Sequence, residues 1–497
     1  MSRKAGPCVL ALDQGTTGST ALVVASDGTV AGRGYREIPQ YYPEPGWVEH
    51  DASEIYELTL AAAHEAIVKS DSVPDAIGIT NQRETVVCWD RRTGQPLGKA
   101  IVWQDRRTTE QCARLAPKAE WIYERTGLVP DPYFSATKLE WLLGRDGVSS
   151  ALHRGDLLAG TIDSWLIWKL TGGAVHATDP TNASRTMLYD IDAMAWSGEL
   201  CELFSIPRAI LPEVGLSSGD FGSTVESIFG KSIPITGVAG DQQAALFGQG
   251  CWKRGQAKNT YGTGAFLLMN VGGARPLVNG AKGLLTTIGC DAKGQPAYAL
   301  EAAIFIAGAA IQWLRDGLGL ISTAGESEAI ARSVQTTGGV YFVPALVGLG
   351  APHWEPDARG TIVGLTRGST RDHVIRAALE AIAYGTADVF ESMSSASGGR
   401  IECLRVDGGA SANDWLMQFQ ADVLGVPVER PELIETTAAG AAGLAGIAAG
   451  IWASAEEFLA TRRFTRFEPS KNISLAEGLG EWRRAVRATL AWARDRR

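Results

Sequence analysis

The sequence lacks the cysteine spacing of a metal site or a disulfide framework. Its seven cysteines are scattered over 497 residues and are never arranged as Cys-x-x-Cys. The pattern excludes a zinc-ribbon type of site and a small, disulfide-stapled secreted scaffold. Because unpaired cysteines are typical of a reducing compartment, we predict a cytoplasmic protein.

An excess of positive charge is missing as well. The chain carries 46 Lys and Arg against 55 Asp and Glu, a formal net charge of −9. This balance argues against nucleic acid or an anionic membrane surface as the main partner. A phosphate ligand is not excluded, since a local site recognises it. With 45% hydrophobic and 20% charged residues, the composition is that of a soluble globular protein of two to four domains.

Strongly apolar runs are also absent. One stretch of twenty uncharged residues, "TTAAGAAGLAGIAAGIWASA" at 436–455, has the length of a membrane span but is mostly Ala and Gly. Its large apolar residues are only Leu444, Ile447, Ile451 and Trp452, too few to drive membrane insertion. We therefore predict no membrane span and a small-residue helix packed inside the fold.

Strand-like and helix-like segments alternate over the whole length, which predicts an α/β fold with sheets covered on their faces. Apolar residues at helical spacing predict helices over 52–70 and 371–392. The predicted strands are 8–12, 21–24, 76–80, 85–89, 233–238, 265–270, 339–344 and 404–406.

A weak internal similarity in the sequence predicts two similar halves. The opening "LALDQGTTGST" resembles "LRVDGGASAND" at 404–414, and "KNTYGTGAFLLMN" at 258–270 also combines an apolar strand with a Gly-rich turn. The polar, Gly-rich segment near 249–258 marks the change between halves. We expect domains at 1–252 and 253–497, with a nucleotide held in the cleft between them.

The opening stretch interrupts two apolar strands with "DQGTTG" at 13–18. We predict a six-residue loop, longer than the two residues that a tight hairpin needs. Backbone N–H groups in a Gly-rich turn suit phosphate, and Asp13 could hold a hydrated Mg²⁺ beside it. The alternative is an ordinary polar hairpin turn in which Asp13 caps the turn.

Two further positions place charge next to apolar strands. Arg83 and Glu84 are adjacent in "GITNQRETVVCW", where a guanidinium and a carboxylate together suit the hydroxyls of a polyol; the alternative is a surface ion pair. Asp241 follows the predicted strand 233–238, and open α/β sheets bind ligands at such strand ends. Its alternative role is a helix N-cap. The Gly-rich turns at 262–264 and 408–409 complete the candidate nucleotide side.

Seven motifs together resemble the FGGY carbohydrate kinases, and within that family the members that phosphorylate glycerol. In chain order they are "ALDQGTT", "GWVEHD" (46–51), "GITNQRET", "IVWQDRRT" (101–108), "GDQQAALFGQ", "KNTYGTG" and "RVDGGA". The resemblance extends from about residue 9 to 450. It implies two ribonuclease-H-like domains of the actin and hexokinase type, which close on Mg-ATP. It also implies in-line phosphoryl transfer from ATP to glycerol, giving sn-glycerol 3-phosphate, with Asp241 as general base.

The resemblance also implies the residues of each subsite. For glycerol these are Arg83, Glu84, Trp103, Tyr133, Asp241, Gln242 and Phe266. For ATP they are Thr16, Thr17, Gly18, Thr263, Gly308, Gln312, Gly409 and Asn413, with Asp13 toward the metal. Two departures stand out: Thr20 replaces an Arg found in many family members, and 225–235 is short and lacks the Gly/Arg loop by which some bacterial members are regulated.

Two other functions stay open at this point. One is a sister kinase for a ketose or gluconate, although the Arg83–Glu84 pair and Trp103 favour a smaller substrate. The other is an actin-like filament or a chaperone ATPase, which would have no need of a polyol site. We expect a homo-oligomer, a dimer or a tetramer, and the sequence does not decide between them.

Overall fold

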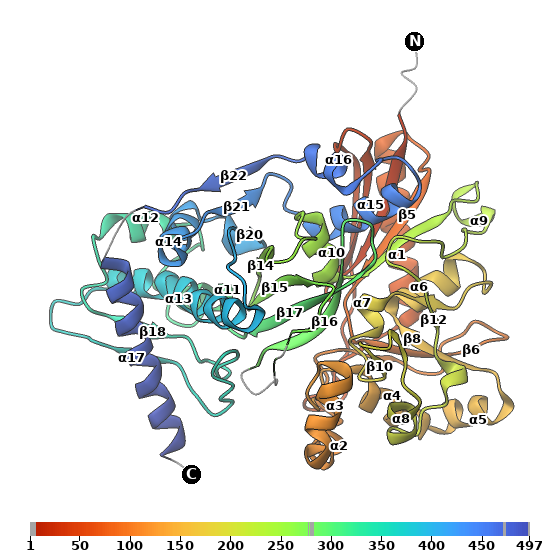
Figure 1. The fold of residues 1–497 in the computed structure, drawn as a ribbon, viewed down its shortest axis with the longest axis horizontal. Coiled ribbons are helices and arrows are strands. Elements are labelled where there is room, and N and C mark those ends of the chain that lie inside the picture. The colour runs from red at the N-terminus through yellow and green to blue at the C-terminus, as the bar shows by residue number, and fades with distance from the viewer. Residues whose placement is uncertain (1–5, 277, 279–282, 471–473, 496–497) are drawn as a thin grey trace.

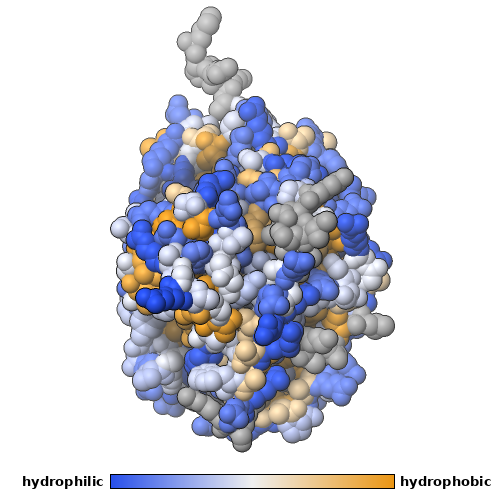
Figure 2. Space-filling view, turned by 90° about the vertical axis from the view of Figure 1, so that its left-hand side faces the viewer, coloured by the Kyte–Doolittle hydropathy of each residue, from blue (hydrophilic) through white to orange (hydrophobic). Residues whose placement is uncertain are grey.

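Two β-sheets, one in each lobe, organise the computed structural model (Figure 1). It describes residues 6–276, 278, 283–470 and 474–495. All seven cysteines are free thiols, and six of them are buried. The face of the C-terminal lobe seen in Figure 2 is mostly hydrophilic, and apolar residues are scattered over it in small areas.

The first sheet has the strand order β3-β2-β1-β5-β13, in which β1, β5 and β13 are parallel and β2 is antiparallel to both of its neighbours. These strands are β1 (Cys8–Gln14), β2 (Gly18–Ala25), β3 (Val30–Glu37), β5 (Ala76–Asn81) and β13 (Ile235–Gly240). Alternate residues of β1 enter different cores: Leu10 and Leu12 share one with Ile55, whereas Val9 and Ala11 share another with Ala442. Helices α1 (Ala52–Ser70) and α15 (Thr436–Ala448) therefore cover opposite faces of this sheet.

The second sheet has the order β16-β17-β15-β14-β20-β21-β22. Its inner strands repeat the first pattern: β14 and β20 are parallel, and β15 is antiparallel to β14 and β17. The hairpin β14–β15 thus takes the place of β1–β2, and β20 takes that of β5. The bounds are β14 (Ala257–Tyr261), β15 (Ala265–Gly272), β16 (Leu285–Cys290), β17 (Pro296–Ile304), β20 (Leu404–Asp407), β21 (Val428–Pro431) and β22 (Phe464–Phe467).

The repeated topology shows which stretches of the two halves correspond. The stretch 258–270 is the topological counterpart of the opening hairpin, whereas 404–414 contains β20 and corresponds to β5. Each lobe therefore presents a Gly-rich hairpin turn and a second loop after a parallel strand.

Smaller elements surround the two sheets. A four-stranded sheet contains β4 (Glu49–His50), β6 (Val86–Asp90), β7 (Ala100–Ile101) and β8 (Leu157–Thr161). The short strands are β9 (Ala177–Thr178), β10 (Tyr189–Asp190), β11 (Ala195–Trp196), β12 (Glu213–Val214), β18 (Tyr341–Val343) and β19 (Thr361–Val363). The helices of the N-terminal half are α2 (Thr109–Arg114), α3 (Ala119–Thr126), α4 (Ser135–Leu143), α5 (Asp146–Arg154), α6 (Ile162–Leu170), α7 (Pro180–Ala183), α8 (Gly198–Leu203), α9 (Glu226–Phe229) and α10 (Asp241–Gly248). Those of the C-terminal half are α11 (Gly308–Asp316), α12 (Glu326–Ser333), α13 (Arg371–Ser397), α14 (Asp414–Leu424), α16 (Ala455–Ala460) and α17 (Ser474–Arg494).

The Ala- and Gly-rich segment forms the buried helix α15, as the sequence predicts, and ends at Ala448 rather than near residue 455. Its small residues permit close packing: a Cβ at Gly440 would lie 1.8 Å from the carbonyl oxygen of Ala244 in α10. A Cβ at Gly78 would lie 2.2 Å from that of Ala441. No helix among the described residues combines the length and apolar character that crossing a bilayer requires.

The predicted six-residue opening loop is wrong. Strand pairing continues to Gln14 opposite Ser19, and the N–H of Gly15 donates to the carbonyl of Gly18 at 2.9 Å. Asp13 therefore lies within β1, and the turn is only Gly15 to Gly18. Polar side chains at the end of a strand do not interrupt the ladder, because its hydrogen bonds are made by the backbone.

Candidate functional site

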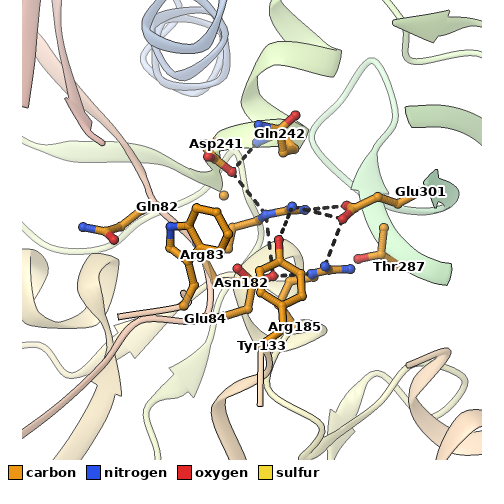
Figure 3. A network of polar contacts seen from close by, with 12 residues as sticks. Gln82, Arg83, Glu84, Tyr133, Asn182, Arg185, Asp241, Gln242, Thr287 and Glu301 are labelled. Atoms are coloured by element: carbon orange, nitrogen blue, oxygen red, sulfur yellow. Dashed lines mark hydrogen bonds and ion pairs between the residues drawn. The ribbon is translucent and has the colours of Figure 1, made fainter. Parts of the chain in front are cut away.

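Two parallel strands of the first sheet end at the same place. Strand β5 leads into Arg83 and Glu84, and the neighbouring β13 leads into Asp241, the first residue of α10. The carboxyl ends of adjacent parallel strands share one edge of a sheet. Arg83 Nε consequently lies 3.1 Å from Asp241 Oδ1 (Figure 3). The structure thus brings together two residues that are far apart in the sequence.

Arg83 and Glu84 do not form a surface ion pair, so that alternative is wrong. Both side chains are only 2% exposed, and Arg83 Nε lies 3.8 Å from Glu84 Oε1. Glu84 adopts a positive φ of 64°, which costs a residue other than glycine about 1–3 kcal/mol unless its surroundings hold it. Here its carbonyl accepts hydrogen bonds from Ser135 Oγ and Lys138 Nζ.

A third carboxylate, Glu301, and a second guanidinium, Arg185, extend the polar network in Figure 3. Glu301, on β17 of the second sheet, accepts from Arg83 Nη1 at 2.6 Å and from Arg83 Nη2 at 3.1 Å. Arg185 donates from Nη2 to Glu301 at 2.9 Å and from Nε to Glu84 at 2.6 Å. Burial opposes the ionisation of Glu301, but Arg185 and Arg83 outweigh it and lower its pKa to about 2.

Sequence reasoning missed Arg185 and Glu301 because neither belongs to a motif and both are distant along the chain. It also missed Gln243, whose Oε1 accepts from Arg83 Nη1 at 3.1 Å. A fourth missed residue is Lys258 on β14, which donates to Gln242 Oε1 at 2.5 Å and to Thr260 Oγ1 at 2.7 Å. Burial lowers the pKa of Lys258 to about 8, although Asp407 and Asp241 favour its charged form.

The aromatic residues predicted for the polyol lie partly at this network. Tyr133 Oη accepts a long hydrogen bond of 3.4 Å from Arg83 Nη2, and the rings of Trp103 and Tyr133 meet edge to face with centroids 5.5 Å apart. Trp103 Nε1 also donates to Thr16 Oγ1 at 2.9 Å. Phe266 lies on β15 of the other lobe, against the small core cluster that contains Leu246.

Asp13 is a carboxylate with other negative charges nearby. Burial raises its pKa to about 7, and the negative charges of Asp241 and Glu435 add to the rise. Among the ion pairs of the described residues, none includes Asp13. Thr20, the position at which the family resemblance predicts an Arg, is the cross-strand partner of Asp13. An Arg at that position would place a cation beside this carboxylate, because cross-strand partners share a face.

A divalent cation at Asp13 would need further ligands besides this carboxylate. No cluster of three or more His, Cys, Asp or Glu suited to a metal occurs in the part of the chain that the structure describes. Mg²⁺ is commonly bound by one or two carboxylates together with waters and substrate phosphates. Asp13, with Asp241 nearby, fits that pattern.

The residues predicted to bind the nucleotide lie in hairpin turns and at the starts of helices, away from the Arg83 network. Thr263 lies in the β14–β15 turn, and its carbonyl accepts the N–H groups of Ala307 at 2.9 Å and Ala309 at 3.0 Å. This ties the turn to Gly308, the first residue of α11, and to Gln312 one helical turn further on. Thr16, Thr17 and Gly18 form the corresponding turn of the first lobe.

The loop after β20 packs on the same hairpin. Gly408 has a φ of +84°, and a Cβ there would lie 2.3 Å from the carbonyl oxygen of Tyr261, the last residue of β14. Nothing lies within 4 Å of the corresponding Cβ position at Gly409. Asn413 caps α14, since its Oδ1 accepts the N–H of Leu416 at 2.9 Å.

Comparison with known proteins identifies the two lobes. Residues 8–248 match the N-terminal domain of the FGGY family of carbohydrate kinases, and residues 257–449 match its C-terminal domain. The chain is 54% identical to glycerol kinase 2 of Thermotoga maritima over 97% of this chain and 99% of that protein. It is also 54% identical to a glycerol kinase of Bordetella parapertussis, with 98% of both chains covered.

Solved structures agree on the architecture. The structure of Plasmodium falciparum glycerol kinase with ADP superposes with a TM-score of 0.93 at 37% identity and covers 99% of both chains. A xylulose kinase of Lactobacillus acidophilus has a TM-score of 0.86 at only 20% identity, a likeness of fold alone. The expected pair of actin- and hexokinase-like lobes is confirmed. The chain belongs to the FGGY family of carbohydrate kinases.

Proposed function

We propose that the protein transfers the terminal phosphoryl group of ATP to glycerol, giving sn-glycerol 3-phosphate and ADP. The proposal depends chiefly on the contact between Arg83 and Asp241 at the shared edge of β5 and β13. It is supported by relatives named glycerol kinase that match nearly the whole chain at 54% identity. The gluconate and xylulose kinases at 20% identity share the fold only and favour neither of those substrates.

Asp241 is the proposed proton acceptor. Its side chain is 32% exposed, whereas Arg83 beside it is 2% exposed, so Asp241 is the member of the pair that a substrate can reach. A carboxylate that accepts the proton of the attacking hydroxyl contributes about 10²–10⁴-fold to the rate. The rest of the acceleration comes from positioning and charge neutralisation, which are the main demands of phosphoryl transfer.

Arg83 must exchange a protein partner for the substrate. Its five N–H groups match five contacts: two with Glu301 and one each with Gln243, Tyr133 and Asp241. The weakest of these by distance is the 3.4 Å bond to Tyr133. We propose that glycerol hydroxyls replace Tyr133 or Asp241 as acceptors, and that Glu84, Trp103, Gln242 and Phe266 line the same pocket. Loss of Arg83 from Asp241 would free the carboxylate for the hydroxyl proton.

ATP and Mg²⁺ are the proposed cosubstrate and metal. Thr16, Thr17, Gly18 and Thr263 would bind the phosphates, Gly308, Gln312, Gly409 and Asn413 the rest of the nucleotide, and Asp13 the metal through waters. Mg²⁺ would neutralise phosphate charge when bound. We further propose that the enzyme works in the cytoplasm as a homo-oligomer, with domains at 1–252 and 253–497.

The decisive experiment is an assay that couples ADP release to NADH oxidation, with glycerol, D-xylulose and D-gluconate offered separately. We expect glycerol-dependent turnover and little with the other two acceptors. Preferred use of xylulose or gluconate would assign a sister kinase. ATP hydrolysis that does not depend on any acceptor, together with filament assembly, would favour the actin-like alternative.

A further inference from the structure

We propose that Glu301 is a positioning residue that holds the substrate-binding Arg83 from the opposite lobe and so couples glycerol binding to nucleotide binding. This inference rests on the proposed function. Arg185 in turn holds Glu301 in place. Neither residue belongs to the sets that the motifs indicate for polyol or nucleotide.

The contacts cross from one lobe to the other. Arg83 follows β5 of the first sheet, and Glu301 lies on β17 of the second. Glu301 engages both terminal nitrogens of Arg83 and is itself fixed by Arg185, which also holds Glu84. All four side chains are no more than 2% exposed. Because a planar guanidinium bound at two nitrogens has little freedom to rotate, Glu301 sets the direction in which Arg83 presents its other N–H groups.

That direction leads to the reacting groups. With Glu301 and Gln243 occupying Nη1 and half of Nη2, the N–H groups that remain are on Nε and Nη2. These face Asp241 at 3.1 Å and Tyr133 at 3.4 Å. Without Glu301, the guanidinium of Arg83 would be free to turn, and two of its nitrogens could then bind Asp241 together. A proton acceptor clamped in this way would be withdrawn from the substrate hydroxyl.

The strand that carries Glu301 also leads to the nucleotide side. From Glu301 the chain passes through the end of β17 to Ala307 and Gly308, whose N–H groups donate to Thr263 and Gly262 at 2.9 and 3.0 Å. In the same strand, Ala303 pairs with Phe266. A nucleotide that orders this turn and draws the lobes together would therefore seat Glu301 against Arg83. The expected result is positive coupling: each substrate tightens the binding of the other.

The test is calorimetric titration of glycerol into the full-length protein with and without Mg-ADP. We define the coupling ratio as the glycerol Kd without ADP divided by the glycerol Kd with ADP. We expect this ratio to be well above one for the unaltered protein and to approach one in Glu301→Gln. Glu301→Asp keeps the charge on a shorter stem and should retain part of the ratio. Turnover of Glu301→Gln should fall more than its glycerol KM rises, since Asp241 becomes clamped.

Glu380→Gln is the matched control. Glu380 is also a buried glutamate of the second lobe, paired with Arg376 at 2.9 Å, but it lies within α13 and bridges no lobes. It should lower thermal stability and leave the coupling ratio unchanged. Arg185→Lys provides a second route should Glu301→Gln fold poorly. It keeps a cation but loses the fork shared by Glu84 and Glu301, and should lower the ratio in part.

An unchanged ratio in folded Glu301→Gln, or in both Glu301→Asp and Arg185→Lys, would overturn the inference. Equal loss of glycerol affinity with and without ADP would do the same, because it is what a merely structural role predicts. Failure of the proposed function would be seen differently, as absence of glycerol binding to the unaltered protein with or without ADP, and it would overturn both proposals.

Discussion

The regions proposed for the polyol and for the nucleotide consist of different kinds of residues. On the side proposed for the polyol, long charged side chains are buried and bond one another: Arg83, Glu84, Arg185 and Glu301 are all at most 2% exposed. On the side proposed for the nucleotide, glycines and short polar residues present backbone at hairpin turns and helix starts, as at Gly308 and Gly409. The first arrangement fixes the direction of a few hydrogen bonds, and the second lets a large anionic ligand approach the main chain.

The difference has a consequence for how each side fails. In a buried charged network, removal of one member leaves a partner charge without compensation, so damage spreads across the whole network. A backbone turn loses a ligand contact without leaving a buried charge behind. Substitutions on the polyol side should therefore disturb stability and catalysis together, whereas those on the nucleotide side can be made selective.

The largest expected effect comes from Asp241→Asn. The amide keeps an oxygen to accept from Arg83 Nε, but it cannot accept the hydroxyl proton. We expect turnover to fall about 10²–10⁴-fold, while calorimetry still detects glycerol and ADP. Turnover within threefold of the unaltered protein between pH 6 and 9 would contradict the proposed role.

Arg83→Ala should act next most strongly, and on one substrate. It deletes the donors proposed for the glycerol hydroxyls, and lost hydrogen bonds to a charged group cost about 1.5–3 kcal/mol each. We expect the glycerol KM to rise by roughly two orders of magnitude and the ATP KM to change far less. Arg83→Lys is the control that keeps the charge but cannot bind Glu301 through a fork. Equal effects on both KM values would point to a structural role.

Lys258 lies at the junction of the two sides and predicts a pH dependence of stability. Its pKa is lowered to about 8 in the fold, so between about pH 8 and 10.5 the unfolded chain binds more protons than the folded one. Stability must then rise with pH over this window, by up to about 3 kcal/mol. The free energy of unfolding can be measured by urea titration at each pH for the unaltered protein and for Lys258→Met. The difference between the two values should rise with pH over this window. The exposed Lys253→Met is the control, and a flat difference for Lys258→Met would contradict the prediction.

Alanine substitutions at Gly408 and Gly409 test whether the loop after β20 binds a ligand or only supports the fold. Gly408→Ala would place a Cβ 2.3 Å from the Tyr261 carbonyl oxygen and should destabilise the protein by about 1–3 kcal/mol. Gly409→Ala meets no protein atom within 4 Å, so its melting temperature should not change. If the nucleotide lies against Gly409, ADP affinity should still fall by about tenfold, the loss expected for one obstructed contact. Unchanged ADP affinity would remove Gly409 from the site.

The same difference between the sides explains what the sequence could reveal. Helix α1 has the predicted bounds of 52–70, because apolar spacing and an N-cap are local signals; Asp51 Oδ1 accepts the N–H of Ser53 at 2.8 Å. Glycine-rich turns and a carboxylate after a strand are equally local, so the hairpins and Asp241 were visible as candidates.

Long-range partners left no such signal. Glu301 is 218 residues from Arg83 and 116 from Arg185, and only the packing of one lobe on the other joins them. The length of the opening turn was misjudged for a related reason. Whether polar residues extend a strand or form a loop depends on the register of the partner strand, which places Gln14 opposite Ser19.

Thr16 connects the two sides, and the smallest effect that we expect is that of its substitution on glycerol binding. Its Oγ1 accepts from Trp103 Nε1 at 2.9 Å, so Thr16→Val removes both a candidate phosphate donor and the partner of a residue predicted for the polyol. The bond to Trp103 is neutral and contributes about 0.5–1.5 kcal/mol, whereas a bond to a charged phosphate contributes about 1.5–3 kcal/mol. We therefore expect the affinity for glycerol to fall roughly two- to tenfold and the affinity for ADP to fall roughly ten- to a hundredfold. Thr17→Val is the matched control, since Thr17 is exposed in the same turn and should weaken ADP alone. Thr16→Ser should restore both affinities because it keeps the hydroxyl. A glycerol affinity that Thr16→Val leaves untouched would show that the Trp103 contact does not reach the polyol, and the two sides would then be separable at this turn.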